Sequence, residues 1–186
     1  MAWRGDFGYT DLLDQKDVPK YDLRIEVLGT LDEASSTLGL ARAMTPNERS
    51  RDLILEIQSD LCWMMSELAA TTEEARPGIH ITAERVDWLA DVMAELQAEA
   101  PVGPQFVAPG DSTSGGFVQL ARTVVRRAER LVTLLDHRKE LHNAQIIAYL
   151  NRLSAILYVL ARFEDQSAGV TSPTPARPSE QAGKRD

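Results

Sequence analysis

The sequence predicts an all-α protein, an antiparallel five-helix bundle with ferritin-like, up-and-down topology. Two observations indicate this fold class. Apolar residues recur three and four positions apart over five long stretches, which is the spacing of one face of an α-helix. No stretch alternates apolar and polar residues as a half-buried strand would, and no internal repeat is visible. Five such helices bury their apolar faces most simply in a bundle.

Start and stop signals divide the chain into these helices. Thr45 precedes Pro46 and stands three residues before Glu48, a good helix start with threonine as the cap. Thr82 is a second expected cap, and Pro101 ends the helix that follows it. The expected helices span about residues 22–41, 45–70, 82–100, 114–135 and 143–163.

Composition bounds the class of protein. The chain has 186 residues, 44% of them apolar, so one domain can bury a core. We expect residues 1–165 to form that domain. Residues 166–186 carry prolines and small polar residues without an apolar pattern, and we expect a disordered tail.

Charge and cysteine content exclude several functions. The net charge of −8 argues against a nucleic-acid or membrane-surface binder. The single cysteine, Cys62, excludes a disulfide framework and a multi-cysteine zinc site. No segment reaches the roughly 20 uncharged apolar residues of a membrane span, so we expect a cytoplasmic protein.

An arginine stripe marks the fourth helix. Arg122, Arg126 and Arg130 are four residues apart and therefore lie one above another, with Glu129 close enough to steer a guanidinium. Such a stripe suits several phosphates in a row, because each guanidinium offers forked, permanently charged donors. The alternative is a solvated helix face laced by carboxylates.

Other polar positions are weaker signals. The string Gly5-Asp6-Phe7-Gly8-Tyr9-Thr10 lets the backbone turn sharply and approach a ligand, although a plain connecting loop would look similar. Asp32 lies at the margin of the first helix's core face and would need a cationic partner. Asn151 and Ser154 form a polar notch in the last helix, paired to a neighbour or offered to a ligand.

The connection over residues 101–116 is long for a compact bundle, and long ordered loops in small domains are often functional. Phe106 is an apolar side chain within it, a position that commonly just pins a loop to the core.

Four segments together resemble one family, the ATP:cob(I)alamin adenosyltransferases of the propanediol-utilisation type. They occur in the family's order and spacing, and the resemblance covers about residues 4–165. The segments are GDFGYT at residues 5–10, RIEVLGTLDE at 24–33, LARTVVRRAER at 120–130 and YLNRLS at 149–154.

This resemblance implies a homotrimer of five-helix bundles with active sites between adjacent subunits. Cobalt of cob(I)alamin would attack the 5′ carbon of ATP, giving adenosylcobalamin and triphosphate. Mg²⁺ would be held mainly through ATP, near Asn151, with no direct metal motif. A flavoprotein reductase and an adenosylcobalamin-dependent enzyme are the implied partners. Because cobalt(I) is itself a strong nucleophile, the chemistry needs no enzymic base, which agrees with the lack of a His or Cys constellation.

The resemblance also implies roles for single residues. Asp32 would pair with Arg122 across the subunit boundary, Arg126 would hold the triphosphate, and Phe106 would pack under the corrin and help to remove the lower axial ligand. The expected nucleotide contacts are Arg4, Gly5, Asp6, Gly8, Tyr9, Thr10, Lys20, Arg126, Glu129 and Asn151.

The N-terminal loop departs from the family pattern. Ala2 and Trp3 stand where members usually carry a threonine and a basic residue, and Phe7 replaces an acidic one. Arg4 could supply the basic group. These departures motivate the alternative function, a non-catalytic corrinoid-binding or delivery protein of the same fold.

Overall fold

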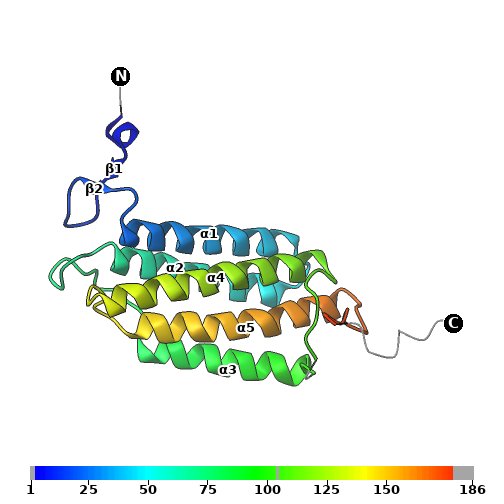
Figure 1. The fold of residues 1–186 in the computed structure, drawn as a ribbon. Coiled ribbons are helices and arrows are strands. Elements are labelled where there is room, and N and C mark those ends of the chain that lie inside the picture. The colour runs from blue at the N-terminus through cyan, green and yellow to red at the C-terminus, as the bar shows by residue number, and fades with distance from the viewer. Residues whose placement is uncertain (1–2, 104, 178–186) are drawn as a thin grey trace.

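Five long helices form a bundle in the computed structural model, which describes residues 3–103 and 105–177 (Figure 1). Consecutive helices run in opposite directions, and a small N-terminal arm projects beyond one end of the bundle. The helices are α1 Leu23–Met44, α2 Glu48–Leu68, α3 Ala83–Glu99, α4 Thr113–His137 and α5 Gln145–Ser167. The arm contains the 3₁₀ turn η1 Arg4–Phe7 and the strands β1 Tyr9–Thr10 and β2 Val18–Pro19.

Side-chain caps begin four of the helices. Asp22, Asn47, Thr82 and Ser112 each accept a hydrogen bond from a backbone amide of the first turn that follows. The expectation that Thr45 caps α2 is wrong. The amide of Thr45 still bonds to a carbonyl of α1, so this residue closes that helix, and Asn47 takes the capping place.

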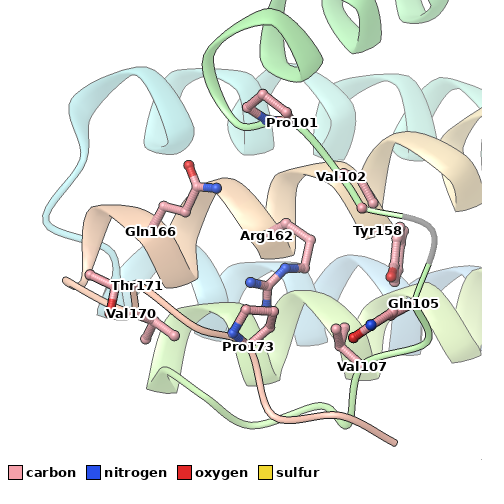
Figure 2. A pocket seen from close by; sticks show the side chains of 11 residues that line it. Pro101, Val102, Gln105, Val107, Tyr158, Arg162, Gln166, Val170, Thr171 and Pro173 are labelled. Atoms are coloured by element: carbon pink, nitrogen blue, oxygen red, sulfur yellow. The ribbon is translucent and has the colours of Figure 1, made fainter.

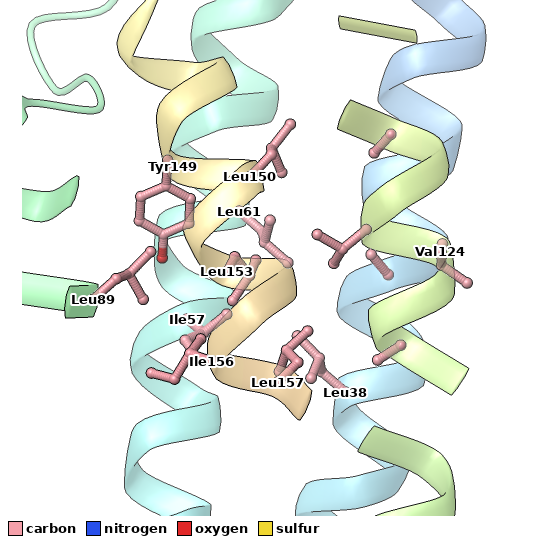
Figure 3. Close-up of a cluster of buried hydrophobic side chains, with 14 of the residues drawn as sticks. Leu38, Ile57, Leu61, Leu89, Val124, Tyr149, Leu150, Leu153, Ile156 and Leu157 are labelled. Carbon is pink, nitrogen blue, oxygen red and sulfur yellow. The ribbon is translucent and has the colours of Figure 1, made fainter. Parts of the chain in front are cut away.

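The core lies between the five helices, and α3, which packs on α5, adds Val86, Leu89 and Leu96 to it (Figure 3). Leu38, Leu61 and Leu157 are fully buried there. Tyr149 is also fully buried, and its hydroxyl donates to Asp60 Oδ2 at 2.6 Å, so the polar atom of this side chain is paired. The apolar rows predicted from the spacing therefore meet in one core.

One leucine of α4 lies at the surface. Leu120 is 50% exposed, on the same helix as Arg126. A row of apolar residues shows that a helix is amphipathic, but the edge of its buried face depends on which neighbours pack against it.

The arm contains a small sheet that the sequence pattern did not predict. Tyr9 pairs with Pro19 and Thr10 with Val18, in antiparallel register. Strands of two residues are too short for any alternation of apolar and polar side chains, which explains why the expectation of no strand is wrong here.

The segment expected to be disordered is partly ordered. Helix α5 continues to Ser167, and residues 170–176 fold back onto the connection before α4. Residues 178–186 lie outside the described part of the chain. Helix α5 is long and apolar enough to cross a membrane, yet 61% of its most apolar window is buried inside the bundle, as in a core helix.

A buried arginine closes the end of the bundle near the arm. Arg24 Nη1 donates to the carbonyl oxygens of Leu68 (2.8 Å) and Ala70 (3.3 Å), and Nη2 to that of Glu140 (2.7 Å). One side chain thereby satisfies carbonyls after the ends of α2 and α4. Burial lowers the pKa of Arg24 from its usual value.

Candidate functional site

The connection before α4 overhangs a hollow of about 450 Å³, here called the Phe106 hollow. Gln119 and Arg122 on α4 and Tyr158 on α5 line it together with Phe106. Phe106 is 81% exposed, so it does not pin the loop to the core. The structure thus brings two of the predicted residues, Phe106 and Arg122, to one space.

Arg122 is a half-buried cation. Its Nε donates to Gln119 Oε1 at 2.7 Å, and it makes no ion pair with a carboxylate among residues 3–103 and 105–177. Burial, and then the neighbouring Arg126, lower the pKa of the Arg122 guanidinium. Such a cation is stabilised by any anion or carboxylate that reaches it.

The rest of the arginine stripe is exposed. Arg130 Nη1 donates to the main-chain carbonyl of Arg126 at 2.9 Å, while Arg127, on another face, forms an ion pair with Glu33. The solvated-face alternative therefore describes Arg127 well. Glu129 is half-buried, and within the described residues its carboxylate makes no contact with an arginine.

Asp32 lies on the exposed surface of α1, in a separate groove of about 530 Å³. Thr10 of the arm, Ile25 and Leu28 line the same groove. Within the described part of one chain Asp32 does not pair with Arg122. The pair expected from the family resemblance is thus not an internal contact of the subunit.

The N-terminal arm (residues 3–22) closes on itself. Lys20 Nζ donates to the carbonyl of Gly5 at 2.8 Å, and Asp6 Oδ2 accepts from the amide of Trp3 at 2.8 Å. Gly8 has a φ of 82°, the left-handed region that glycine enters without strain. Four predicted nucleotide contacts, at Gly5, Asp6, Gly8 and Lys20, therefore lie together; the side chain of Arg4 is outside the described part.

The arm is anchored by Asp14, which the sequence analysis missed. The Asp14 carboxylate accepts from the amide and hydroxyl of Thr71 and of Thr72, at 2.9 to 3.2 Å. These hydrogen bonds lower the pKa of Asp14 to about 2, and the bond from the Thr71 amide has the largest effect. The amide of Leu13 also donates to the carbonyl of Ala69 (3.1 Å), so the base of the arm is fixed to the end of α2.

The expected polar notch on α5 differs from the prediction. Asn151 is exposed, and the hydroxyl of Ser154 donates to its main-chain carbonyl at 2.9 Å. Its amide side chain makes no hydrogen bond within the described residues, so it is open to a ligand or a second chain. Tyr158 lies seven residues on, hence on the same helix face. That spacing is the one sequence signal that could have found Tyr158.

A protein metal centre has no support in the described ranges. No group of three or more His, Cys, Asp or Glu side chains that could hold a metal ion occurs there.

Comparisons with known proteins agree with this geometry. Residues 2–164 match the family model of cobalamin adenosyltransferase. The corrinoid adenosyltransferase PduO of Citrobacter freundii is 35% identical over 165 residues, which cover 88% of this chain and 49% of that protein, so the chain spans about half of its length. The corrinoid adenosyltransferase of Bacillus subtilis (strain 168) is 36% identical over 170 residues, which cover 89% of this chain and 86% of that protein.

A solved structure has the same fold. It is a variant of the PduO-type ATP:corrinoid adenosyltransferase from Lactobacillus reuteri, complexed with cobalamin and ATP. The TM-score is 0.84 at 25% identity, and the match covers 95% of this chain and 96% of the other.

Proposed function

The chain belongs to the cobalamin adenosyltransferase family, and we propose that it transfers the 5′-deoxyadenosyl group of ATP to cob(I)alamin. The cobalt lone pair forms a bond to the 5′ carbon, the bond from that carbon to the triphosphate oxygen breaks, and triphosphate leaves with its electron pair. The products are adenosylcobalamin and triphosphate.

One observation carries this proposal. In the Phe106 hollow an exposed aromatic ring and a half-buried cation without a carboxylate partner in its own chain face the same space. A flat apolar macrocycle can lie against the ring while a phosphate or carboxylate reaches Arg122. An apolar ring under the corrin excludes water and nitrogen ligands from cobalt, which promotes loss of the lower axial ligand.

The phosphates are the second part of the proposal. Arg126, exposed on α4, holds the triphosphate, and the arm wraps it with the residues around Gly5 and Gly8 and with Lys20. Neutralising the leaving group's charge and placing the 5′ carbon are the tasks of these residues. Mg²⁺ supplies further charge neutralisation when bound. Asn151 can offer it an amide oxygen, a ligand type that this hard cation accepts, and ATP oxygens and water complete its shell.

We propose a homotrimer with sites between adjacent subunits, each bundle having ferritin-like topology. Three features of one chain support the interfacial site: Asp32 and Arg122 line different hollows, the arm projects away from the bundle, and Leu120 is exposed on α4, the helix that carries the arginines. Asp32 of one subunit would pair with the half-buried Arg122 of the next.

The cellular setting follows as part of the same proposal. The net charge of −8 supports small-molecule substrates rather than nucleic acid or a membrane surface. We place the protein in the cytoplasm, with a flavoprotein reductase supplying cob(I)alamin and an adenosylcobalamin-dependent enzyme using the product.

An anaerobic assay tests the function. The protein is mixed with chemically reduced cob(I)alamin and MgATP, and the corrin absorbance is followed as the cobalt–carbon bond forms. We expect Arg126→Ala to lower kcat by about 10²- to 10³-fold, the usual cost of one donor to a developing anion. Arg138→Ala, which removes an exposed arginine just after the end of α4, is the matched control and should leave the rate unchanged.

The departures at Ala2, Trp3 and Phe7 favour a second candidate, a corrinoid-binding or delivery protein of the same fold. In that case the corrinoid binds, but ATP produces no adenosylcobalamin. This outcome, obtained with freshly reduced cofactor, would replace the transferase proposal.

A further inference from the structure

The chain after α5 returns to the segment that carries Phe106. Residues 170–176, here called the strap, pair with the Phe106 loop, residues 105–112. Ala108 N donates to the carbonyl of Thr174 at 2.8 Å, and Ala176 N donates to the carbonyl of Phe106 at 2.9 Å. Phe106 is therefore held through its own carbonyl and through the residue two positions on.

The strap is fastened by one carboxylate. Asp111 Oδ2 accepts from the amide of Thr174 at 3.0 Å, and Asp111 Oδ1 accepts from the Thr174 hydroxyl at 2.6 Å. These hydrogen bonds lower the pKa of Asp111, and the bond from the Thr174 hydroxyl has the largest effect. Asp111 thus stays a charged acceptor at neutral pH, and hydrogen bonds to a charged group are the stronger kind.

The hydrogen-bonded pair of Asp111 and Thr174, here called the fastening, is connected to both flanking helices, α4 and α5. Arg162 of α5 pairs with Asp165 at 2.7 Å and reaches Asp111 at 3.5 Å. Asp165 Oδ1 accepts from the hydroxyl of Ser112 at 2.6 Å, and the same hydroxyl caps α4. The strap consequently has a fixed position relative to α4, the helix that carries Arg122.

The strap also walls a second hollow of about 310 Å³ (Figure 2). Val170, Thr171 and Pro173 line one side of it, and Tyr158 and Arg162 another. The second hollow and the Phe106 hollow share lining residues on the Phe106 loop. The loop stands between two spaces with little packing of its own, so its attachment to the strap decides where it lies.

We propose that Asp111 and Thr174 are positioning residues, which act through the strap to hold the Phe106 ring in the Phe106 hollow. The inference rests on the proposed function, in which that ring lies under the corrin. A loop without the strap would place the ring there for only a fraction of the time, and the rate would fall to that fraction of the wild-type value. ATP binding should not change, because among the described residues no hydrogen bond joins the strap to Arg126 or to the arm.

Two full-length variants test this role. Ala176→Pro removes the amide that donates to Phe106, and Thr174→Val removes the hydroxyl that donates to Asp111 while keeping the side chain's shape. Ser172→Pro is the matched control, since within the described residues the Ser172 amide makes no hydrogen bond. Thermal unfolding by circular dichroism confirms that each variant keeps its fold.

The expected readout separates positioning from binding. We expect kcat to fall about 5- to 20-fold in both test variants with KM for ATP unchanged, the result of a smaller competent population. The absorbance of enzyme-bound cob(II)alamin should shift toward the form that keeps its lower ligand. A higher KM for ATP at unchanged kcat would overturn the inference.

A double substitution supplies the sharper test. In a Phe106→Ala background the strap variants should cost nothing further, because the group that they position is gone. Losses that multiply would show that the strap acts elsewhere and would overturn the inference.

Hydrogen exchange tests the strap without the reaction. The Ala108 amide should exchange slowly in the wild type and at least about tenfold faster in both variants, since its acceptor lies on the strap. If the wild type makes no adenosylcobalamin, the proposed function fails while this measurement still reports on the strap. Unchanged exchange at Ala108 in both variants would overturn the inference by itself.

Discussion

The N-terminal arm and the Phe106 loop are both non-helical, and in both an aspartate accepts hydrogen bonds from threonine. Asp14 anchors the arm to Thr71 and Thr72, and Asp111 fastens Thr174 of the strap. The two segments differ in where these attachments lie relative to the residues expected to bind a ligand. The arm residues expected to bind ATP lie at a distance from the attachments at Leu13 and Asp14, whereas the strap holds the Phe106 loop at Phe106 itself, at Ala108 and at Asp111.

This difference indicates how each half of the site is made. The arm extends from its own bundle, so a second subunit or the nucleotide must complete its surroundings (Figure 1). The Phe106 loop is positioned by its own chain before any ligand arrives. Under the proposed function, the ATP half of the site would therefore be completed by assembly, whereas the corrinoid half would be formed by folding.

The largest expected effect comes from mixing subunits. Asp6→Ala and Arg126→Ala should each lower turnover about 10²-fold or more. Co-assembled in equal amounts, the two variants should recover about a quarter of wild-type activity, because each site of a head-to-tail ring draws its two halves from different chains. The activity of mixed and unmixed samples is compared at equal protein concentration. A mixture no more active than its components would place both residues in one subunit's site.

A glycine comparison tests the rigidity of the fastened end. A Cβ at position 115 would overlap Asp165 Oδ1 and lie 2.7 Å from Ser112 Oγ, whereas a Cβ at position 29 meets nothing within 4 Å. We expect Gly115→Ala to destabilise the fold by about 1–3 kcal/mol, the cost of overpacking. Gly29→Ala, the control in the exposed face of α1, should be neutral or stabilise by up to about 1 kcal/mol. Chemical denaturation measures both, and equal effects would contradict a tightly packed fastening.

The anchor of the arm should matter for one substrate only. Asp14→Asn weakens the bonds to Thr71 and Thr72, so we expect KM for ATP to rise about three- to tenfold, with KM for the corrinoid and the thermal midpoint unchanged. Glu74→Gln, an exposed carboxylate in the same α2–α3 connection, is the control. A matching rise in KM for the corrinoid would mean that the two ends of the subunit are not independent.

The smallest expected effect is a pH dependence of the folding stability, caused by Asp165 near the end of α5. Burial raises the pKa of Asp165, while the hydrogen bonds of Asp14 lower its pKa to about 2. A carboxyl with a raised pKa adds stability at low pH and loses that contribution as pH rises through the folded value. Asp165 therefore favours the folded state more near pH 4 than at pH 7, whereas the contribution of Asp14 is complete above about 4 and is lost toward 2.

Denaturation midpoints of the wild type and Asp165→Asn at both pH values measure this difference. The small gain in stability near pH 4 should be absent from the variant. A gain of the same size in the variant would assign it to another group.

Five helices could be predicted because each carries its own apolar period and most of its start and stop signals. The exposure of Leu120 could not be predicted, since the period of one helix does not reveal what covers its remaining faces. The fastening could not be predicted from the sequence, for a different reason. Asp111 and Thr174 are 63 residues apart, and the strap is held largely by backbone hydrogen bonds, which leave no pattern in the side chains.

The site residues also divide into those that a local pattern or the family resemblance identified and those that neither identified. Arg122 and Phe106 were recognised from local pattern and family resemblance, and the structure brings them to one hollow. Asp14 and Tyr158 were not recognised, because an aspartate in a loop and a tyrosine in a core helix are common in any bundle.

The position of the strap in the sequence has a consequence for biosynthesis. The ribosome delivers residues 170–176 after all five helices, at about 5–20 residues per second, so the bundle can pack while the Phe106 loop still lacks its support. A nascent chain whose five helices have left the ribosome before the strap would therefore hold a packed bundle with an unsupported Phe106 loop, so that loop gains its position after the core has formed.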